Sequence, residues 1–162
     1  GGEGVFLGEA AARHPSLQLH LFDLPAVAAR GKAALAAKGF GDRLTVTGGD
    51  FFRDPLPTGA DLISLVRVLH DHDDAPVRAL LRKAHAALAP GGTLLVIEPM
   101  AGVAGAEMVG EAYFALYLLA MGSGRARTPD ELAAMLREAG FREVSARPVR
   151  SPIRTGVLVA RK

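Results

Sequence analysis

The segment 65–74, LVRVLHDHDD, leads from an apolar run directly into His70 and Asp71, side chains that exchange protons. A neutral imidazole near its working pH can take a proton from a hydroxyl group. Glu98 ends the next apolar run along the chain, TLLVIE. A carboxylate beside a catalytic histidine fixes its tautomer and stabilises its charged form. We therefore interpret His70 as a candidate general base and Glu98 as the group that orients it.

Simpler roles remain open for this cluster. His70 would also suit a core or helix-capping histidine, and we interpret Asp73 or Asp74 as the N-cap of the helix that follows. A metal site is a further alternative, because His70 and His72 would share one face of an extended segment. No third ligand is evident elsewhere in the sequence, so we predict no metal.

A second set of residues is suited to bind a nucleoside. The glycine turn GGEG at 1–4 leads into a helix, and such turns let a ligand approach backbone N–H groups. Asp23, in HLFDLP, ends a strand where a carboxylate can accept both ribose hydroxyls, although it would also suit a helix N-cap. Asp50, in GGDFF, ends another strand, with Phe51 placed to pack on a flat ring. A turn carboxylate beside core aromatics is the alternative for this pair.

These strand ends lie on one edge of the predicted sheet, where open α/β sheets bind ligands, and together they describe an adenosine-type pocket. The cofactor is then either a nicotinamide dinucleotide or S-adenosylmethionine (SAM). Leu7 stands where a dinucleotide fingerprint needs its third glycine, and there are too few strands for a second mononucleotide half. The sequence favours the methyl donor SAM, with a nicotinamide oxidoreductase as the rival.

Strands and helices alternate in the sequence that positions these residues. Apolar runs predict strands at 17–22, 44–47, 60–68 and 93–98, and helical spacing predicts helices at 26–37 and 75–88. Near-continuous apolar strands between amphipathic helices indicate a parallel sheet covered on both faces, so the predicted class is a doubly wound α/β fold. We expect Pro-Gly-Gly at 90–92 to be the turn from helix into strand.

The regular alternation of predicted strands and helices ends after Glu98. We predict an apolar helix at 106–121, a helix that starts with proline at 129–139, and β segments at 143–148 and 153–160 that pair as an antiparallel hairpin. The strand that should feed the glycine turn is missing. We therefore expect a chain truncated at its N-terminus, with the first strand of its sheet absent.

Composition narrows the class of protein. The 162 residues are 49% hydrophobic, and the net charge of +2 is too balanced for nucleic acid to be the main partner. The absence of cysteine excludes disulfides and thiolate metal sites. No apolar run reaches the length of a membrane span, and the sequence shows no basic-then-apolar leader, so we expect a soluble, cytoplasmic protein.

Taken in order and spacing, the blocks GGEG, LFDLP, GGDFF, RVLHDHDD, APGGTLLVIEP and GRART resemble the class I SAM-dependent O-methyltransferases of the caffeate and hydroxyneurosporene type. The resemblance covers the whole chain. It implies a Rossmann-like methyltransferase sheet whose last strand is antiparallel, and a SAM-binding catalytic domain over residues 1–162. It also implies that an N-terminal helical domain, absent here, makes the full-length protein a homodimer.

The resemblance assigns roles to individual residues. His70 resembles the general base and Glu98 one of its two flanking carboxylates. The second carboxylate usually sits where this chain has Ala126, and Asp71 is expected to compensate. His72 stands where an aromatic residue commonly follows. The cofactor contacts implied by the matching blocks are Gly2, Gly4, Asp23, Leu24, Asp50, Phe51 and Arg67.

The methyl acceptor is expected to be hydrophobic. The predicted helix at 106–121 supplies a wide apolar surface that suits a hydrophobic alcohol. The same surface would equally suit packing against a helical domain or a second subunit. The segment YFALYLLAMGSGRART resembles the bacterial carotenoid O-methyltransferases acting on hydroxyneurosporene or demethylspheroidene. Alternatives are another secondary-metabolite or bacteriochlorophyll-type acceptor, or a SAM-binding protein without catalysis. The expected substrate contacts are Leu116, Tyr117 and Met121.

Overall fold

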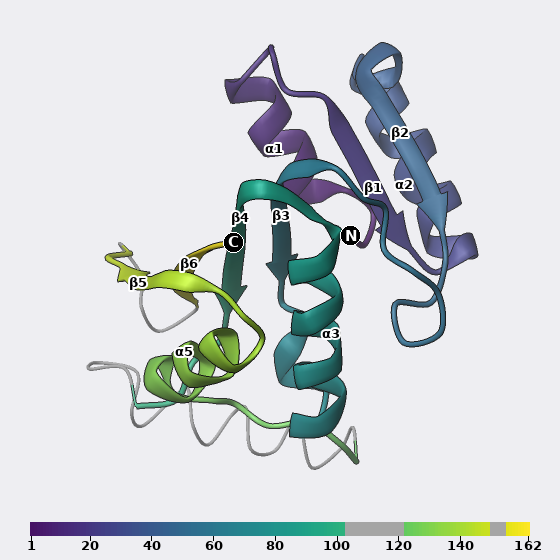
Figure 1. Cartoon of the computed structure of the whole chain (residues 1–162). Helices are drawn as coiled ribbons and strands as arrows, with labels where there is room; N and C mark the ends of the chain where they lie inside the picture. Colours follow the sequence, from purple (N-terminus) through teal and green to yellow (C-terminus); the bar gives the residue numbers. More distant parts are fainter. Residues whose placement is uncertain (103–121, 150–154) are drawn as a thin grey trace. The chain divides into compact units, whose positions relative to one another are not determined.

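The computed structural model describes residues 1–102, 122–149 and 155–162 (Figure 1). The chain divides into two compact units, Gly1–Pro57 and Thr58–Lys162. In each unit, strands are hydrogen-bonded into a sheet that helices contact.

In the first unit, two parallel strands carry the candidate nucleoside-binding residues at one end. The elements are α1 (Val5–Arg13), β1 (Leu19–Asp23), α2 (Pro25–Ala37), a 3-10 turn η1 (Gly41–Arg43) and β2 (Leu44–Gly48). The register pairs Leu19 with Leu44 and Asp23 with Gly48, so both strands end at the same edge. α2 contacts both strands and its Leu35 is buried with Leu21.

The second unit contains a mixed sheet. Its elements are β3 (Ala60–Val66), a 3-10 turn η2 (Leu69–Asp71), α3 (Asp74–Ala87), β4 (Leu88–Glu98), α5 (Pro129–Glu138), β5 (Arg142–Arg147) and β6 (Gly156–Arg161). The strand order is β3-β4-β6-β5. β3 and β4 are parallel, while β6 runs antiparallel to both β4 and β5. The predicted α/β class, the terminal hairpin and the antiparallel last strand are confirmed.

The core of the second unit lies between this sheet and its helices. Figure 1 shows α3 running along β3 and β4, and α5 beside the β5–β6 hairpin. Leu94 and Val96 on β4 are fully buried, as are Leu81 on α3 and Leu136 on α5. Burying this apolar face, rather than helix propensity, supplies most of the stability of such amphipathic helices.

Several predicted boundaries differ from the structure, and two of the differences have a clear physical cause. β3 ends at Val66 rather than at residue 68, because Arg67 has a positive φ of 54° and turns the chain out of the strand. β4 begins at Leu88 rather than at Thr93, because Leu88 already pairs with Ala60. The ladder then shifts register across the segment that contains Pro-Gly-Gly, so this segment lies within the strand instead of before it.

The predicted helix at 106–121 lies almost wholly outside the described residues. Among the helices that the structure does describe, none has the length and hydropathy needed to cross a membrane.

Candidate active site

The glycine turn of the first unit separates into an open position and a packed one. Gly2 has a φ of 56°, and a Cβ there would meet nothing within 4 Å. Gly4, the N-cap of α1, has a φ of 76° and is buried, and its Cβ would lie 2.6 Å from Cδ1 of Leu35. Gly2 can therefore present bare backbone to a ligand, whereas the lack of a side chain at Gly4 serves packing.

The Asp23 carboxylate, at the end of β1, closes this turn. Its Oδ2 accepts hydrogen bonds from the N–H of Gly2 at 2.7 Å and from the main-chain nitrogen of Gly1 at 2.8 Å, and its Oδ1 from the N–H of Leu24 at 2.8 Å. Burial acts to raise the pKa of Asp23, but these bonds outweigh it and lower the pKa below the ordinary value. The side chain is 24% exposed, so an ionised acceptor faces solvent beside the 52% exposed Leu24.

The loop after β2 brings Asp50 to the same edge. The Gly49 N–H donates to the Asp23 carbonyl at 2.9 Å, which ties the loop to the end of β1. Asp50 Oδ1 accepts the Phe52 N–H at 2.9 Å, so the carboxylate orders its own turn. The rings of Phe51 and Phe52 meet edge to face with centroids 4.4 Å apart, and Phe52 is 44% exposed. An aromatic surface thus stands beside the carboxylates.

In the second unit, His70 and Glu98 form a buried pair. His70 Nδ1 lies 2.7 Å from Glu98 Oε2, and the two side chains are 3% and 1% exposed. Glu98 Oε1 accepts the N–H groups of Val68 at 2.7 Å and Leu69 at 2.8 Å. Because the ionised carboxylate only accepts, we assign the proton of the neutral ring to Nδ1. This leaves Nε2 as the basic nitrogen.

Asp71 lies on the Nε2 side of the same ring. Its Oδ1 is 3.2 Å from His70 Nε2, an ion-pair distance. The oxygen is buried and accepts no hydrogen bond with suitable angles from the described residues. A buried acceptor of this kind fits a nearby donor, either a hydroxyl group or Nε2–H once the ring is charged.

The structure corrects the local setting of this cluster. His70 lies in the 3-10 turn η2, not at the end of a strand, so the extended geometry assumed for a shared His70 and His72 face does not apply. Asp73 occupies the N-cap position of α3 without a capping hydrogen bond, and its Oδ1 instead accepts the Gly124 N–H at 3.1 Å. Asp74 is the first residue of α3 and binds arginines.

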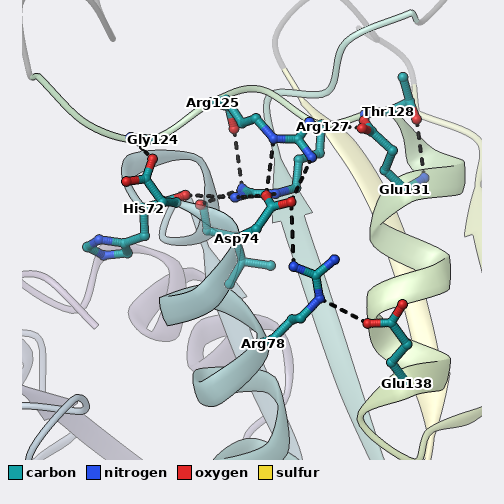
Figure 2. A network of polar contacts seen from close by, with 11 residues as sticks. His72, Asp74, Arg78, Gly124, Arg125, Arg127, Thr128, Glu131 and Glu138 are labelled. Carbon is teal, nitrogen blue, oxygen red and sulfur yellow. Dashed lines mark hydrogen bonds and ion pairs between the residues drawn. The ribbon is translucent and has the colours of Figure 1, made fainter.

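Sequence reasoning assigned no role to one residue near this turn, Arg127, whose side chain is almost fully buried. Its guanidinium donates to the carbonyls of Leu69 and His72 and to the carboxylate of Asp74, as Figure 2 shows for the last two. Arginine is rarely buried without such partners. The helix start beside it did carry a signal, because Thr128 and Glu131 form a capping box of the spacing T-x-x-E.

Other predicted site residues fall elsewhere. Arg67 is exposed, belongs to the second unit, and donates its backbone N–H to Ile97. His72 is half-buried, and burial lowers its pKa. The described residues contain no group of three or more histidine, aspartate or glutamate side chains arranged to hold a metal. The predicted substrate contacts Leu116, Tyr117 and Met121 lie outside the described residues.

The family follows from residues 1–142, which match the model of the O-methyltransferase domain. The chain belongs to this family, as the sequence blocks predicted. Demethylspheroidene O-methyltransferases of Rhodobacter capsulatus and Cereibacter sphaeroides are 46% and 45% identical to it, over 100% and 91% of the chain. The crystal structure of human N-acetylserotonin methyltransferase in complex with SAM is similar over 100% of the chain, with 32% identity and a TM-score of 0.85.

The matched part is less than half of each of these proteins. The chain covers 40% and 39% of the two bacterial relatives and 45% of the human chain.

Proposed function

We propose that residues 1–162 form the catalytic domain of a SAM-dependent O-methyltransferase that methylates a hydroxyl group of a hydrophobic small molecule. The observation that carries the proposal is the buried His70–Glu98 pair, with its 2.7 Å hydrogen bond, in a chain of the O-methyltransferase family. Such a pair is a general base held in one tautomer.

The first unit supplies groups that fit SAM. The ionised Asp23 carboxylate matches the two donors of a ribose diol, and the open backbone at Gly2 leaves room for the methionine part. The exposed side chain of Leu24 and the ring of Phe51 suit adenine, whose faces are apolar. The human relative was solved with SAM. When bound, SAM supplies a methyl group made electrophilic by its sulfonium.

The second unit supplies the proton chemistry. Nε2 of His70 would take the proton that the acceptor hydroxyl loses as its oxygen replaces the sulfur on the methyl carbon, with S-adenosylhomocysteine as the leaving group. Glu98 holds Nδ1–H throughout and stabilises the imidazolium that results. After the transfer, Asp71 Oδ1, 3.2 Å from Nε2, accepts a hydrogen bond from the new Nε2–H. Asp71 thereby replaces the second flanking carboxylate, which Ala126 cannot supply.

A hydroxylated carotenoid is the acceptor that we propose. Support comes from the two demethylspheroidene O-methyltransferases, which match 100% and 91% of the chain at 46% and 45% identity. The apolar composition of residues 106–121 agrees with a hydrophobic acceptor.

Calorimetric titration of the full-length protein with SAM and, separately, with NAD tests the cofactor. We expect micromolar binding of SAM and no binding of NAD. Asp23→Ala should weaken SAM binding about tenfold or more, because it removes a charged acceptor of hydrogen bonds. Asp42→Ala, an exposed carboxylate on η1, is the matched control and should bind like wild type. Binding of NAD, or equal affinity in the two variants, would contradict the proposed pocket.

Turnover with a hydroxylated carotenoid then separates an enzyme from a SAM-binding protein without catalysis. Formation of the methyl ether with release of S-adenosylhomocysteine supports the proposal. Binding of SAM without turnover of any hydroxylated acceptor contradicts the catalytic role and leaves the binding role.

A further inference from the structure

The segment 122–128 lies against the backbone that carries His70. A Cβ at Gly124 would overlap the His70 carbonyl oxygen and would lie 2.6 Å from the Asp71 carbonyl carbon. The Ser123 hydroxyl donates to the Asp71 carbonyl at 3.3 Å. Backbone contact this close requires glycine at position 124 and fixes the distance between the segment and η2.

Arg127 bridges the two ends of the same turn. Its Nη1 donates to the Leu69 carbonyl at 2.9 Å, and its Nη2 donates to the His72 carbonyl at 2.8 Å. These carbonyls belong to the residues immediately before and after the pair His70 and Asp71. The guanidinium is planar and rigid, so two bonds from one group fix the separation and direction of both carbonyls.

The guanidinium of Arg127 also forms an ion pair with Asp74. Asp74 Oδ1 accepts from Arg127 Nε at 3.0 Å and Nη2 at 2.8 Å (Figure 2). Arg125 donates to both oxygens of the same carboxylate at 3.1 Å. The hydrogen bonds from Arg125, and those from Arg127, lower the pKa of Asp74 to about 2, so the carboxylate stays ionised at neutral pH. Arg127 is only 2% exposed and has little freedom to move.

Resting on the function proposed above, we propose that Arg127 is the positioning residue of the general base. Glu98 fixes one nitrogen of the His70 ring, but the place of the ring also depends on the backbone from which it projects. Arg127 fixes that backbone through the carbonyls of Leu69 and His72. The other ring nitrogen is thereby aimed at the acceptor hydroxyl. Arg127 itself touches neither cofactor nor substrate in this role.

Arg127→Lys in the full-length protein tests this role. Lysine keeps the charge, but a single ammonium cannot reproduce the planar fork that joins two carbonyls to a carboxylate. We expect kcat to fall about a hundredfold, as a small misplacement of a catalytic group does, with the KM for SAM unchanged. Arg78→Lys is the matched control. Arg78 belongs to the same network, through Asp74 at 3.5 Å and Glu138 at 3.0 Å, but contacts neither carbonyl, so its kcat should stay at the wild-type value.

A spectroscopic readout needs no turnover. The Nδ1–H of His70, in its short bond to Glu98, should give a downfield proton resonance in NMR, assigned by its loss in His70→Gln. Loss or displacement of this resonance in Arg127→Lys, with unchanged signals in Arg78→Lys, supports the proposal. An unchanged resonance together with unchanged kcat overturns it, as does an equal fall of kcat in the two lysine variants.

A second variant applies if Arg127→Lys does not fold. Gly124→Ala pushes a methyl group against the carbonyls of His70 and Asp71 without any change of charge. It should also displace the resonance and lower kcat. A folded Gly124→Ala protein with the wild-type resonance and kcat overturns the proposal. If wild type shows no methyl transfer but the resonance still depends on Arg127, the proposed function fails while the positioning role stands.

Discussion

The carboxylates of the two units differ in what surrounds them. Asp23, in the first unit, is 24% exposed and accepts hydrogen bonds from main-chain nitrogens of the glycine turn and of Leu24. Glu98, in the second unit, is 1% exposed and bonds to a titratable ring. A carboxylate that binds a ligand must keep acceptor capacity at the surface. A carboxylate that fixes a tautomer works best where water cannot compete for it.

Glu98→Gln should cause the largest effect, because it replaces the buried carboxylate that fixes the tautomer of His70. The amide oxygen would go on accepting the N–H groups of Val68 and Leu69, which turns the amide NH₂ toward His70 Nδ1. The ring must then accept at Nδ1 and carry its proton on Nε2, so it cannot act as a base. We expect kcat to fall about a hundredfold or more in steady-state assays, as for loss of the base itself, with unchanged SAM affinity.

Glu138→Gln is the control for this change, since Glu138 is an exposed partner of Arg78. Wild-type kcat is expected. A Glu98→Gln enzyme that kept nearly full kcat would show that the tautomer of His70 does not matter.

The two glycines of the first unit provide the next test. Gly4→Ala should lower the free energy of unfolding by about 3 kcal/mol, from a left-handed backbone and overpacking against Leu35. Gly2→Ala has the backbone penalty alone, about 1 kcal/mol, because no atom lies within 4 Å of its Cβ. Urea denaturation measures both. Equal losses would contradict the division into an open and a packed position.

The smallest expected effect concerns acid stability in the second unit. The pKa of Asp74, about 2, is below its ordinary value of 3.8. The unfolded state therefore binds the proton more readily, and the stabilisation is complete above about pH 4 and lost as pH falls toward 2. Asp74→Asn should lower the free energy of unfolding by about 1 kcal/mol at pH 7, because the side chain is 32% exposed and screened.

The difference between wild type and Asp74→Asn should shrink below pH 4 in urea titrations repeated across pH. Asp61→Asn, an exposed carboxylate on β3, is the control. A difference that did not change with pH would mean that charge at Asp74 contributes nothing.

Sequence periodicity placed the strand ends, and with them Asp23 and Glu98, because alternating strands and helices leave few arrangements for a parallel sheet. The turn at His70 could not be predicted in the same way. It depends on the positive φ of Arg67 and on N–H bonds to Glu98, 29 and 30 residues away along the chain. Local propensity does not contain such distant partners.

Arg127 is the clearest case of what sequence pattern misses. An arginine in a glycine-rich segment normally predicts solvent exposure. Its burial depends on carbonyls 55 and 58 residues earlier in the chain. The turn at Asp50, by contrast, was foreseen as one alternative, because aspartate orders such turns through its own neighbours.

The most direct test of the proposed mechanism is His70→Ala in the full-length protein, with SAM affinity and turnover measured on the same sample. The imidazole should matter only for proton transfer, so we expect kcat to fall about a hundredfold or more while the Kd for SAM stays at the wild-type value. Unchanged turnover would contradict the assignment of His70 as the general base.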